Sequence, residues 1–238
     1  MSTTSLILLY LAAALAISRL PMFRVYFSLC NTLIEKIIHV LAIVVTREGK
    51  SNKIKLYKNG SGETTSIVHS KIQKVMIVYI GYTSTLLLAM GLFYLLSFNK
   101  FHFIIYFFIG LLVISILLWI RNPFGVLWAL SFVILLALPL YFRNELAIMH
   151  ISIFLSSLIL IQAIINAIQV IRQSFKTGEK SGALAKIARI PAVICGIALL
   201  GQSLYATYFI FIKVLNLKLA MIRFELLEII QIMEKFIT

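Results

Sequence analysis

The chain has 238 residues, of which 61% are hydrophobic and 13% are charged, and its mean hydropathy is +1.03. Soluble domains are only about half apolar, so this composition excludes an ordinary soluble protein and predicts one that lies in the lipid bilayer. The formal net charge of +14 at pH 7 would by itself suit a nucleic-acid partner. The basic residues, however, occupy short gaps between apolar runs rather than one exposed stripe, so we expect no nucleic acid to bind.

Apolar runs of about 20 residues, the length that crosses roughly 30 Å of hydrocarbon, divide most of the chain. Seven candidate spans cover approximately residues 4–18, 25–45, 75–98, 101–120, 125–142, 146–171 and 190–212. The first is short for a span, and Pro21 helps to end it. No soluble domain interrupts the runs. We therefore expect one transmembrane domain over residues 1–212, with the fold of an all-α, polytopic helical bundle of about six or seven spans.

Two linkers predict how the chain is oriented. Residues 46–74 hold seven basic residues against two acidic ones, and residues 172–189 hold five against one. Because basic residues resist translocation, both linkers are predicted to be cytoplasmic. Four candidate spans separate them, an even number, so the two assignments agree. Arg19 and Arg24 then fall on the opposite side of the membrane, which conflicts with the same rule.

The first basic linker contains a hairpin signal in the stretch KIKLYKNGSGETTSI, residues 53–67. Apolar and polar residues alternate at Ile54 and Leu56 before the NGSG turn, and at Thr65 and Ile67 after it. Alternation with a period of two around a turn rich in Gly and Asn predicts a small cytoplasmic β-hairpin at the membrane surface. The alternative is a solvated basic loop.

The last segment, residues 213–238, is predicted to form an amphipathic C-terminal helix. Its apolar residues fall on one helical face: Leu219, Ile222, Leu226, Ile229 and Met233. Charged residues fall largely on another face, and neither Gly nor Pro interrupts the segment. Such a helix lies either on the membrane or on a partner protein, and the sequence leaves both open.

The second candidate span contains charged residues in the stretch NTLIEKIIHVL, residues 31–41. Ionisable groups within a membrane are costly and usually functional. In a helix Glu35 and His39 face the same way, whereas Lys36 points about 100° round. One interpretation is an ion pair, with Lys36 reaching towards the headgroups and His39 hydrogen-bonded within the bundle. The other is a metal site, because zinc proteases carry H-E-x-x-H on a helix.

Five motifs in order resemble the site-2-protease-like intramembrane zinc metallopeptidases, specifically the short, multi-span branch common in Gram-positive bacteria. Members of that branch read N-T-x-x-H-E-x-G-H-A on an early span and then have a basic hairpin ending in G-x-T. A Gly-Tyr pair, an Arg-Asn turn between two spans, and S-D-A with L-A-x-x-T-x-I-P before the last span follow. The matching stretches here are NTLIEKIIHVL (31–41), KIKLYKNGSGETT (53–65), IGYTSTLLLAMG (80–91), LWIRNPFGVLW (118–128) and SGALAKIARIP (181–191). The resemblance covers about residues 25–212 and implies a multi-pass protein of the bacterial cell membrane.

The resemblance also assigns the active-site positions. In the family two histidines and a distant aspartate bind zinc, and a glutamate beside the first histidine activates water. Placed residue by residue, Glu35 stands at the first histidine and Lys36 at the glutamate. His39 stands at the second histidine and Gly182 at the aspartate. Three of the four positions therefore differ from the family pattern.

A count of ligands argues against hydrolytic zinc. Catalytic zinc needs three protein ligands, an open position for water and a nearby base. The chain contains no aspartate, so Glu35 and His39 supply two ligands at most from this helix. The ammonium group of Lys36 repels a cation and accepts no proton while it is charged. Three further histidines are expected at interfaces or in solvent rather than at a metal: His69, His102 and His150. We expect no catalytic residue, no metal and no cofactor.

The sequence therefore predicts a catalytically inactive, protease-like membrane protein that binds or regulates another membrane protein or a transmembrane segment. One alternative is an active zinc intramembrane protease that uses Glu35, His39 and an unforeseen third ligand. The other is a subunit of a transporter or channel complex, suggested by polar residues along the sixth candidate span. In membrane helices such residues more often join neighbouring helices than line a pore. They are Ser156, Ser157, Gln162, Asn166 and Gln169.

Overall fold

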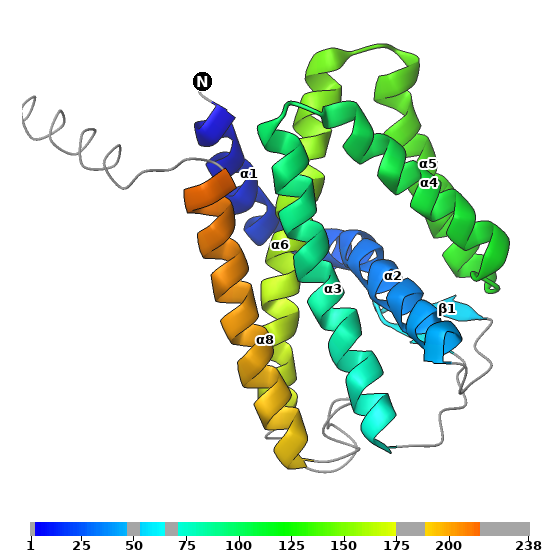
Figure 1. The fold of residues 1–238 in the computed structure, drawn as a ribbon. Helices are drawn as coiled ribbons and strands as arrows, with labels where there is room; N and C mark the ends of the chain where they lie inside the picture. The colour runs from blue at the N-terminus through cyan, green and yellow to red at the C-terminus, as the bar shows by residue number, and fades with distance from the viewer. Residues whose placement is uncertain (1–2, 47–52, 65–70, 175–188, 215–238) are drawn as a thin grey trace, which may run out of the picture.

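The computed structural model describes residues 3–46, 53–64, 71–174 and 189–214, and most of them are helical (Figure 1). The elements in chain order are α1 (Thr3–Ile17), α2 (Pro21–Thr46), β1 (Ile54–Leu56), β2 (Gly62–Thr64), α3 (Lys71–Ser97), α4 (Phe101–Leu118), α5 (Pro123–Tyr141), α6 (Glu145–Ser174), α8 (Arg189–Phe209) and the π-helix η2 (Ile210–Val214). Six helices contain segments that are apolar and long enough to cross a membrane, whereas the apolar part of α1, Leu6–Ile17, is shorter. The predicted all-α, polytopic bundle is confirmed, with six candidate spans in the part of the chain that the structure describes.

Two tight turns set where the helices between α3 and α6 end. Asn99 has a φ of 56° between α3 and α4, and Arg143 has a φ of 50° between α5 and α6. A residue in the left-handed region cannot continue a right-handed helix. Asn144 then caps α6, because its Oδ1 accepts a hydrogen bond from the backbone N–H of Ala147 at 3.0 Å. Short turns of this kind reverse the chain, as a bundle of consecutive membrane spans requires.

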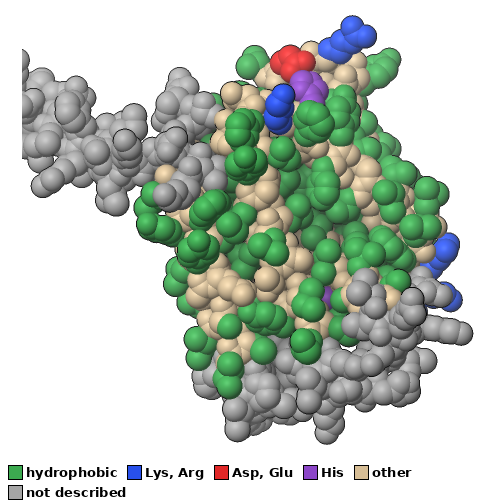
Figure 2. All heavy atoms as spheres, in the orientation of Figure 1, with side chains coloured by type: hydrophobic (Ala, Val, Ile, Leu, Met, Phe, Trp, Pro, Cys, Tyr) green, Lys and Arg blue, Asp and Glu red, His purple; other side chains and the backbone are tan. Residues whose placement is uncertain are grey.

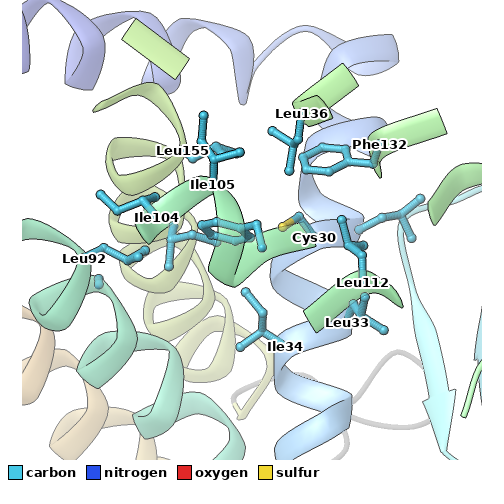
Figure 3. Close-up of a cluster of buried hydrophobic side chains, with 14 of the residues drawn as sticks. Cys30, Leu33, Ile34, Leu92, Ile104, Ile105, Leu112, Phe132, Leu136 and Leu155 are labelled. Carbon is cyan, nitrogen blue, oxygen red and sulfur yellow. The ribbon is translucent and has the colours of Figure 1, made fainter. Parts of the chain in front are cut away.

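Helix α6 lies at the centre of the bundle. It packs against α1, α3, α4, α5 and α8. In Figure 1, α3, α6 and α8 run side by side, while α2 crosses obliquely from α1 towards β1. The core joins side chains of α2 to those of α3, α4, α5 and α6, and ten of its residues are labelled in Figure 3: Cys30, Leu33, Ile34, Leu92, Ile104, Ile105, Leu112, Phe132, Leu136 and Leu155. Because lipid tails are as apolar as these side chains, close packing rather than exclusion of water holds the helices together.

The outer surface of the bundle is apolar over a broad band. In Figure 2, hydrophobic side chains cover the middle of the molecule, and charged side chains gather at its upper end and its right edge. Large apolar residues of α4 and α5 point outwards, including Leu117 at 67% and Leu127 at 68% exposure. An apolar band of this size suits contact with lipid, so the chain is a multi-pass membrane protein.

The hairpin predicted in the first basic linker is present. Strands β1 and β2 are antiparallel, with Lys55 opposite Glu63, and Gly60 takes a φ of 82° in the turn. The positions 65 and 67, which the alternation also included, lie outside the described residues. Asn122, in the turn between α4 and α5, accepts a hydrogen bond from the Leu56 N–H at 3.1 Å and donates one to the Leu56 carbonyl at 2.5 Å. The hairpin and the α4–α5 turn therefore lie on the same side of the bundle.

The helix count agrees with the predicted relation between the two basic linkers. Four candidate spans, those of α3, α4, α5 and α6, separate residues 46–74 from residues 172–189. An even number of spans returns the chain to the side from which it started. That this side is the cytoplasm remains a prediction. The amphipathic helix expected over 213–238 lies outside the described residues except for its first two, which belong to η2.

Candidate functional site

Helix α2 carries the three ionisable residues of the EKIIH stretch into the interior of the bundle. Lys36 Nζ donates to Glu35 Oε1 at 2.9 Å, and His39 Nε2 lies 3.8 Å from the same carboxylate oxygen. Glu35 and His39 are 7% and 5% exposed. The ion pair that the sequence suggested is therefore present, with Lys36 turned towards Glu35. A buried carboxylate is stable here because a cation compensates its charge.

Helix α3 approaches this stretch closely at Gly81. A Cβ atom at position 81 would lie 2.1 Å from His39 Nε2 and 3.3 Å from Glu35 Cγ. Side-chain atoms do not approach each other as closely as the first distance, so only glycine allows α3 to pack here. His39 Nε2 consequently faces the α3 backbone. The Gly-Tyr pair that opens this span has a packing role at its first residue, while Tyr82 lines a neighbouring cavity.

The other histidines within the described residues do not join His39. His102 Nε2 lies 3.4 Å from Glu145 Oε1 at an exposed turn between spans. His150 Nδ1 lies 3.0 Å from Tyr10 Oη, where α1 meets α6. No group of three or more His, Cys, Asp or Glu side chains comes together in the part of the chain that the structure describes.

The residues around His39 do not fit a catalytic zinc ion. Glu35 and His39 provide two donors, and the Glu35 carboxylate already accepts from the Lys36 ammonium group. A charged ammonium group at this distance repels a metal cation and cannot take a proton from water. Gly182 and His69, which the sequence also raised, lie outside the described residues, and the expected absence of a metal stays a prediction.

A polar cavity of about 760 Å³ adjoins the ion pair. Its walls come from the turn between α1 and α2, the first half of α2, the turn of the hairpin, Tyr82 of α3 and the second half of α6. The charged residues of the lining are Arg19, Arg24, Glu35, Lys36 and Arg172. Among the lining residues that the structure describes, four are cations and one is a carboxylate, so the cavity suits an anion better than a cation.

The cavity brings together residues that the sequence treated separately. Arg19 and Arg24 line the same space as the hairpin turn, and the side of the membrane on which they lie remains a prediction. Helix α1, at 15 residues, is short for a span, as the sequence indicated. The polar residues of α6 differ in what they contact. The Ser156 hydroxyl donates to the Ser152 carbonyl of its own helix, whereas Asn166 lines the cavity.

One helix contact does match the expected joining role. Gln162 Nε2 donates to Ser18 Oγ at 3.4 Å and so links α6 to the end of α1. Sequence reasoning missed Asn31 and Asn122 as structural or site residues. For Asn122 a signal existed, because an Asn-Pro pair at a turn often uses its side chain to bond backbone groups. For Asn31 the signals were its place at the start of the NTLIEKIIHVL motif and its position beside the charged stretch.

Comparison with known proteins identifies the class of this fold. A family model described as Peptidase M50B-like matches residues 7–210, which is most of the chain. The chain therefore belongs to the Peptidase M50B-like family, as its site-2-protease-like motifs indicated. No curated protein and no solved structure gives a significant match.

Proposed function

We propose that this chain is a catalytically inactive member of the M50B-like family that binds or regulates another membrane protein. In this role it holds a membrane segment of its partner beside α2 without cutting it. The observation that carries the proposal is the 2.9 Å contact from Lys36 Nζ to Glu35 Oε1. It places a cation at the position where the family pattern has the glutamate that activates water.

The contact removes two catalytic functions at once. A general base must accept a proton, and the Lys36 ammonium group cannot accept one while it is charged, because its nitrogen has no free lone pair. The Glu35 carboxylate, at the position of a histidine ligand, is neutralised by its neighbour and so has less negative charge to offer a metal. Restoring hydrolysis would need both changes reversed.

The space next to the pair supports a binding role. A cavity of about 760 Å³ lies within the range of ligand-binding pockets, roughly 300–1,000 Å³. It is bounded by α2 and by the hairpin turn, where Thr32 Oγ1 donates to the Gly60 carbonyl at 3.0 Å. Binding on rigid elements of this kind requires no chemical step.

The first test measures metal. The full chain is purified from membranes without chelators, and its zinc content is compared with that of His39→Ala and of His102→Ala, which changes a histidine at an exposed turn. We expect the unmodified chain to contain far less than one zinc per molecule. Near-stoichiometric zinc that is lost in His39→Ala but kept in His102→Ala would overturn the proposal.

The second test looks for the partner. A photo-crosslinking residue is placed in cells at Ile168, which lines the cavity, and as a control at Leu127 on the outer surface of α5. We expect an adduct with an intact membrane segment of one protein from position 168 and none from position 127. A cleaved partner, whose cleavage stops in Glu35→Gln, would instead support an active protease.

A further inference from the structure

The geometry points to a second function for the polar cavity: it binds a phosphate-bearing anionic ligand through Arg19, Arg24 and Arg172. The ligand class is a phosphate ester, supplied either by the headgroup of an anionic phospholipid or by a soluble phosphate compound. This inference does not depend on whether the chain hydrolyses peptides, because it rests on the arginines and not on the Glu35–Lys36 pair.

The charge of the cavity wall is the first observation. Glu35 is the one carboxylate among the described residues of the lining, and Lys36 already bonds it. The three arginines form no ion pair with any described residue. Three guanidinium groups facing one space repel each other, and an anion between them relieves that repulsion. Guanidinium forks match phosphate oxygens in a bidentate manner, which makes phosphate the best-fitting anion.

The depth of the cavity is the second observation. Its lining on α6 begins at Gln162 and ends at Arg172, ten residues further on, which is about 15 Å of helix or roughly half the hydrocarbon thickness. Gln162 also bonds Ser18 at the end of α1, and this contact fixes the arginine-bearing turn at that depth. All three arginines are exposed, so a ligand that enters the cavity can reach their guanidinium groups.

The third observation is an unpartnered buried side chain. Asn31 is 2% exposed and lines the cavity, yet its Oδ1 has no hydrogen-bond partner among the described residues. A buried amide oxygen without a partner costs free energy, and rotation of the Asn31 side chain towards a donor on a ligand in the cavity would remove that cost. A phosphate ester bearing hydroxyl groups supplies both anionic oxygens for the arginines and donors for an amide oxygen.

An apolar strip of the wall indicates how a lipid would enter. Val25, Ile165 and Ile168 line the cavity together with the polar groups, and Ile168 is 43% exposed at the outside of α6. Exposed apolar surface therefore adjoins the arginines of the cavity. A phospholipid can place its phosphate on the arginines while its chains remain with the surrounding lipid.

The test uses the full chain purified in mild detergent. It is incubated with phosphatidylcholine vesicles that contain phosphatidylglycerol, and bound lipid is identified by native mass spectrometry. Binding of inorganic phosphate and of glycerol phosphate is measured on the same sample by calorimetry. We expect the double variant Arg24→Gln/Arg172→Gln to bind the phosphate-bearing ligand at least about tenfold more weakly. Asn31→Ala should weaken binding by a smaller factor.

A matched control separates the site from total charge. Lys100→Gln/Arg121→Gln also removes two positive charges, at exposed positions outside the cavity lining, and should bind within about twofold of the unmodified chain. The unmodified chain should also lose affinity as salt is raised, which needs no variant to fold. Binding of phosphatidylglycerol alone identifies a lipid, and competition by glycerol phosphate identifies a soluble source.

Three results would overturn the inference. In the first, the cavity variant binds as well as the charge-matched control. In the second, neither phosphatidylglycerol nor the soluble phosphates bind more tightly than phosphatidylcholine. In the third, an acidic peptide binds with the same dependence on the arginines while no phosphate compound does.

Discussion

Helices α2 and α4 are both long enough to cross a membrane, yet they differ in how much of their surface the protein buries. Of the candidate span in α2, 56% is buried inside the protein, against 28% of the span in α4. The α2 span carries Glu35, Lys36 and His39, whereas outward-facing residues of α4 such as Phe103 and Leu117 are apolar. Charge is tolerated in α2 because the protein, not the lipid, surrounds it and supplies partners.

The composition of a span therefore depends on whether lipid or protein surrounds it. A helix that faces lipid needs only an apolar surface, and many sequences satisfy that condition. A helix inside the bundle must match specific groups on α3, α6 and the hairpin. Changes around α2 should therefore affect stability more than equivalent changes on lipid-facing helices. Four experiments, in order of expected effect, test the contacts described here.

The largest expected effect comes from Gly81→Ala. The new Cβ would lie 2.1 Å from His39 Nε2, so either the buried His39 ring or the helices α2 and α3 must shift. We expect a loss of about 3 kcal/mol in the free energy of unfolding, measured by denaturation in detergent. Gly91→Ala is the control, because nothing lies within 4 Å of its Cβ position and alanine favours a helix. Equal stability of the two variants would contradict the packing described here.

Lys36→Met should have the next largest effect. It leaves the Glu35 carboxylate without its 2.9 Å partner, in side chains that are only 16% and 9% exposed. Breaking a buried pair costs several kcal/mol, and because the pair adjoins a polar cavity we expect about 2 kcal/mol. The double variant Glu35→Gln/Lys36→Met should recover most of this loss. Failure of the double variant to recover would show that Lys36 acts through packing rather than charge.

Asn122→Ala tests the link between the α4–α5 turn and the hairpin. The variant removes two hydrogen bonds to Leu56, and we expect a loss of about 1.5 kcal/mol that is confined to the hairpin. Faster hydrogen exchange of the β1 and β2 amides would report it. Asn144→Ala removes a helix cap at another turn and should leave hairpin exchange unchanged. Similar hydrogen exchange in both variants would argue against the hydrogen bonds from Asn122 to the hairpin.

The smallest effect is a change in the titration of Tyr57. Its hydroxyl donates to Glu63 Oε2 at 2.8 Å, and this hydrogen bond to a carboxylate raises the pKa of Tyr57. The stabilisation is present below the ordinary tyrosine pKa of about 10 and is lost as pH rises through the raised value. Glu63→Gln should lower the pKa of Tyr57, as seen by NMR of labelled tyrosine. No change would mean that the side chains do not meet in solution.

The secondary structure was largely readable because it depends on local properties. Runs of apolar residues long enough to cross a bilayer predicted the spans, and the alternation around NGSG predicted the hairpin. The five ordered motifs were enough to indicate the family. The i, i+4 spacing of Glu35 and His39 likewise placed them on one helical face, as the structure shows.

The site was less readable because it depends on contacts between distant segments. Nothing near Gly81 in the sequence indicates that His39 lies against it. Nothing in the sequence indicates that Arg19 and Arg24 share a cavity with Arg172, which lies far along the chain on α6. The unpartnered Asn31 oxygen, and the cavity lined by residues of α2, α6 and the turn after α1, exist only once these helices pack together.

The sequence alone therefore determined that the protein is a helical bundle in a membrane, and it determined that Glu35 and His39 share one face of a helix. Composition and short-range periodicity fix these properties, because the bilayer demands apolar length and a helix fixes which residues share a face. Only the tertiary structure decided that Lys36 turns towards Glu35 and that Arg19, Arg24 and Arg172 line one cavity. Those outcomes depend on which helices touch, and close packing between segments far apart in the chain decides that.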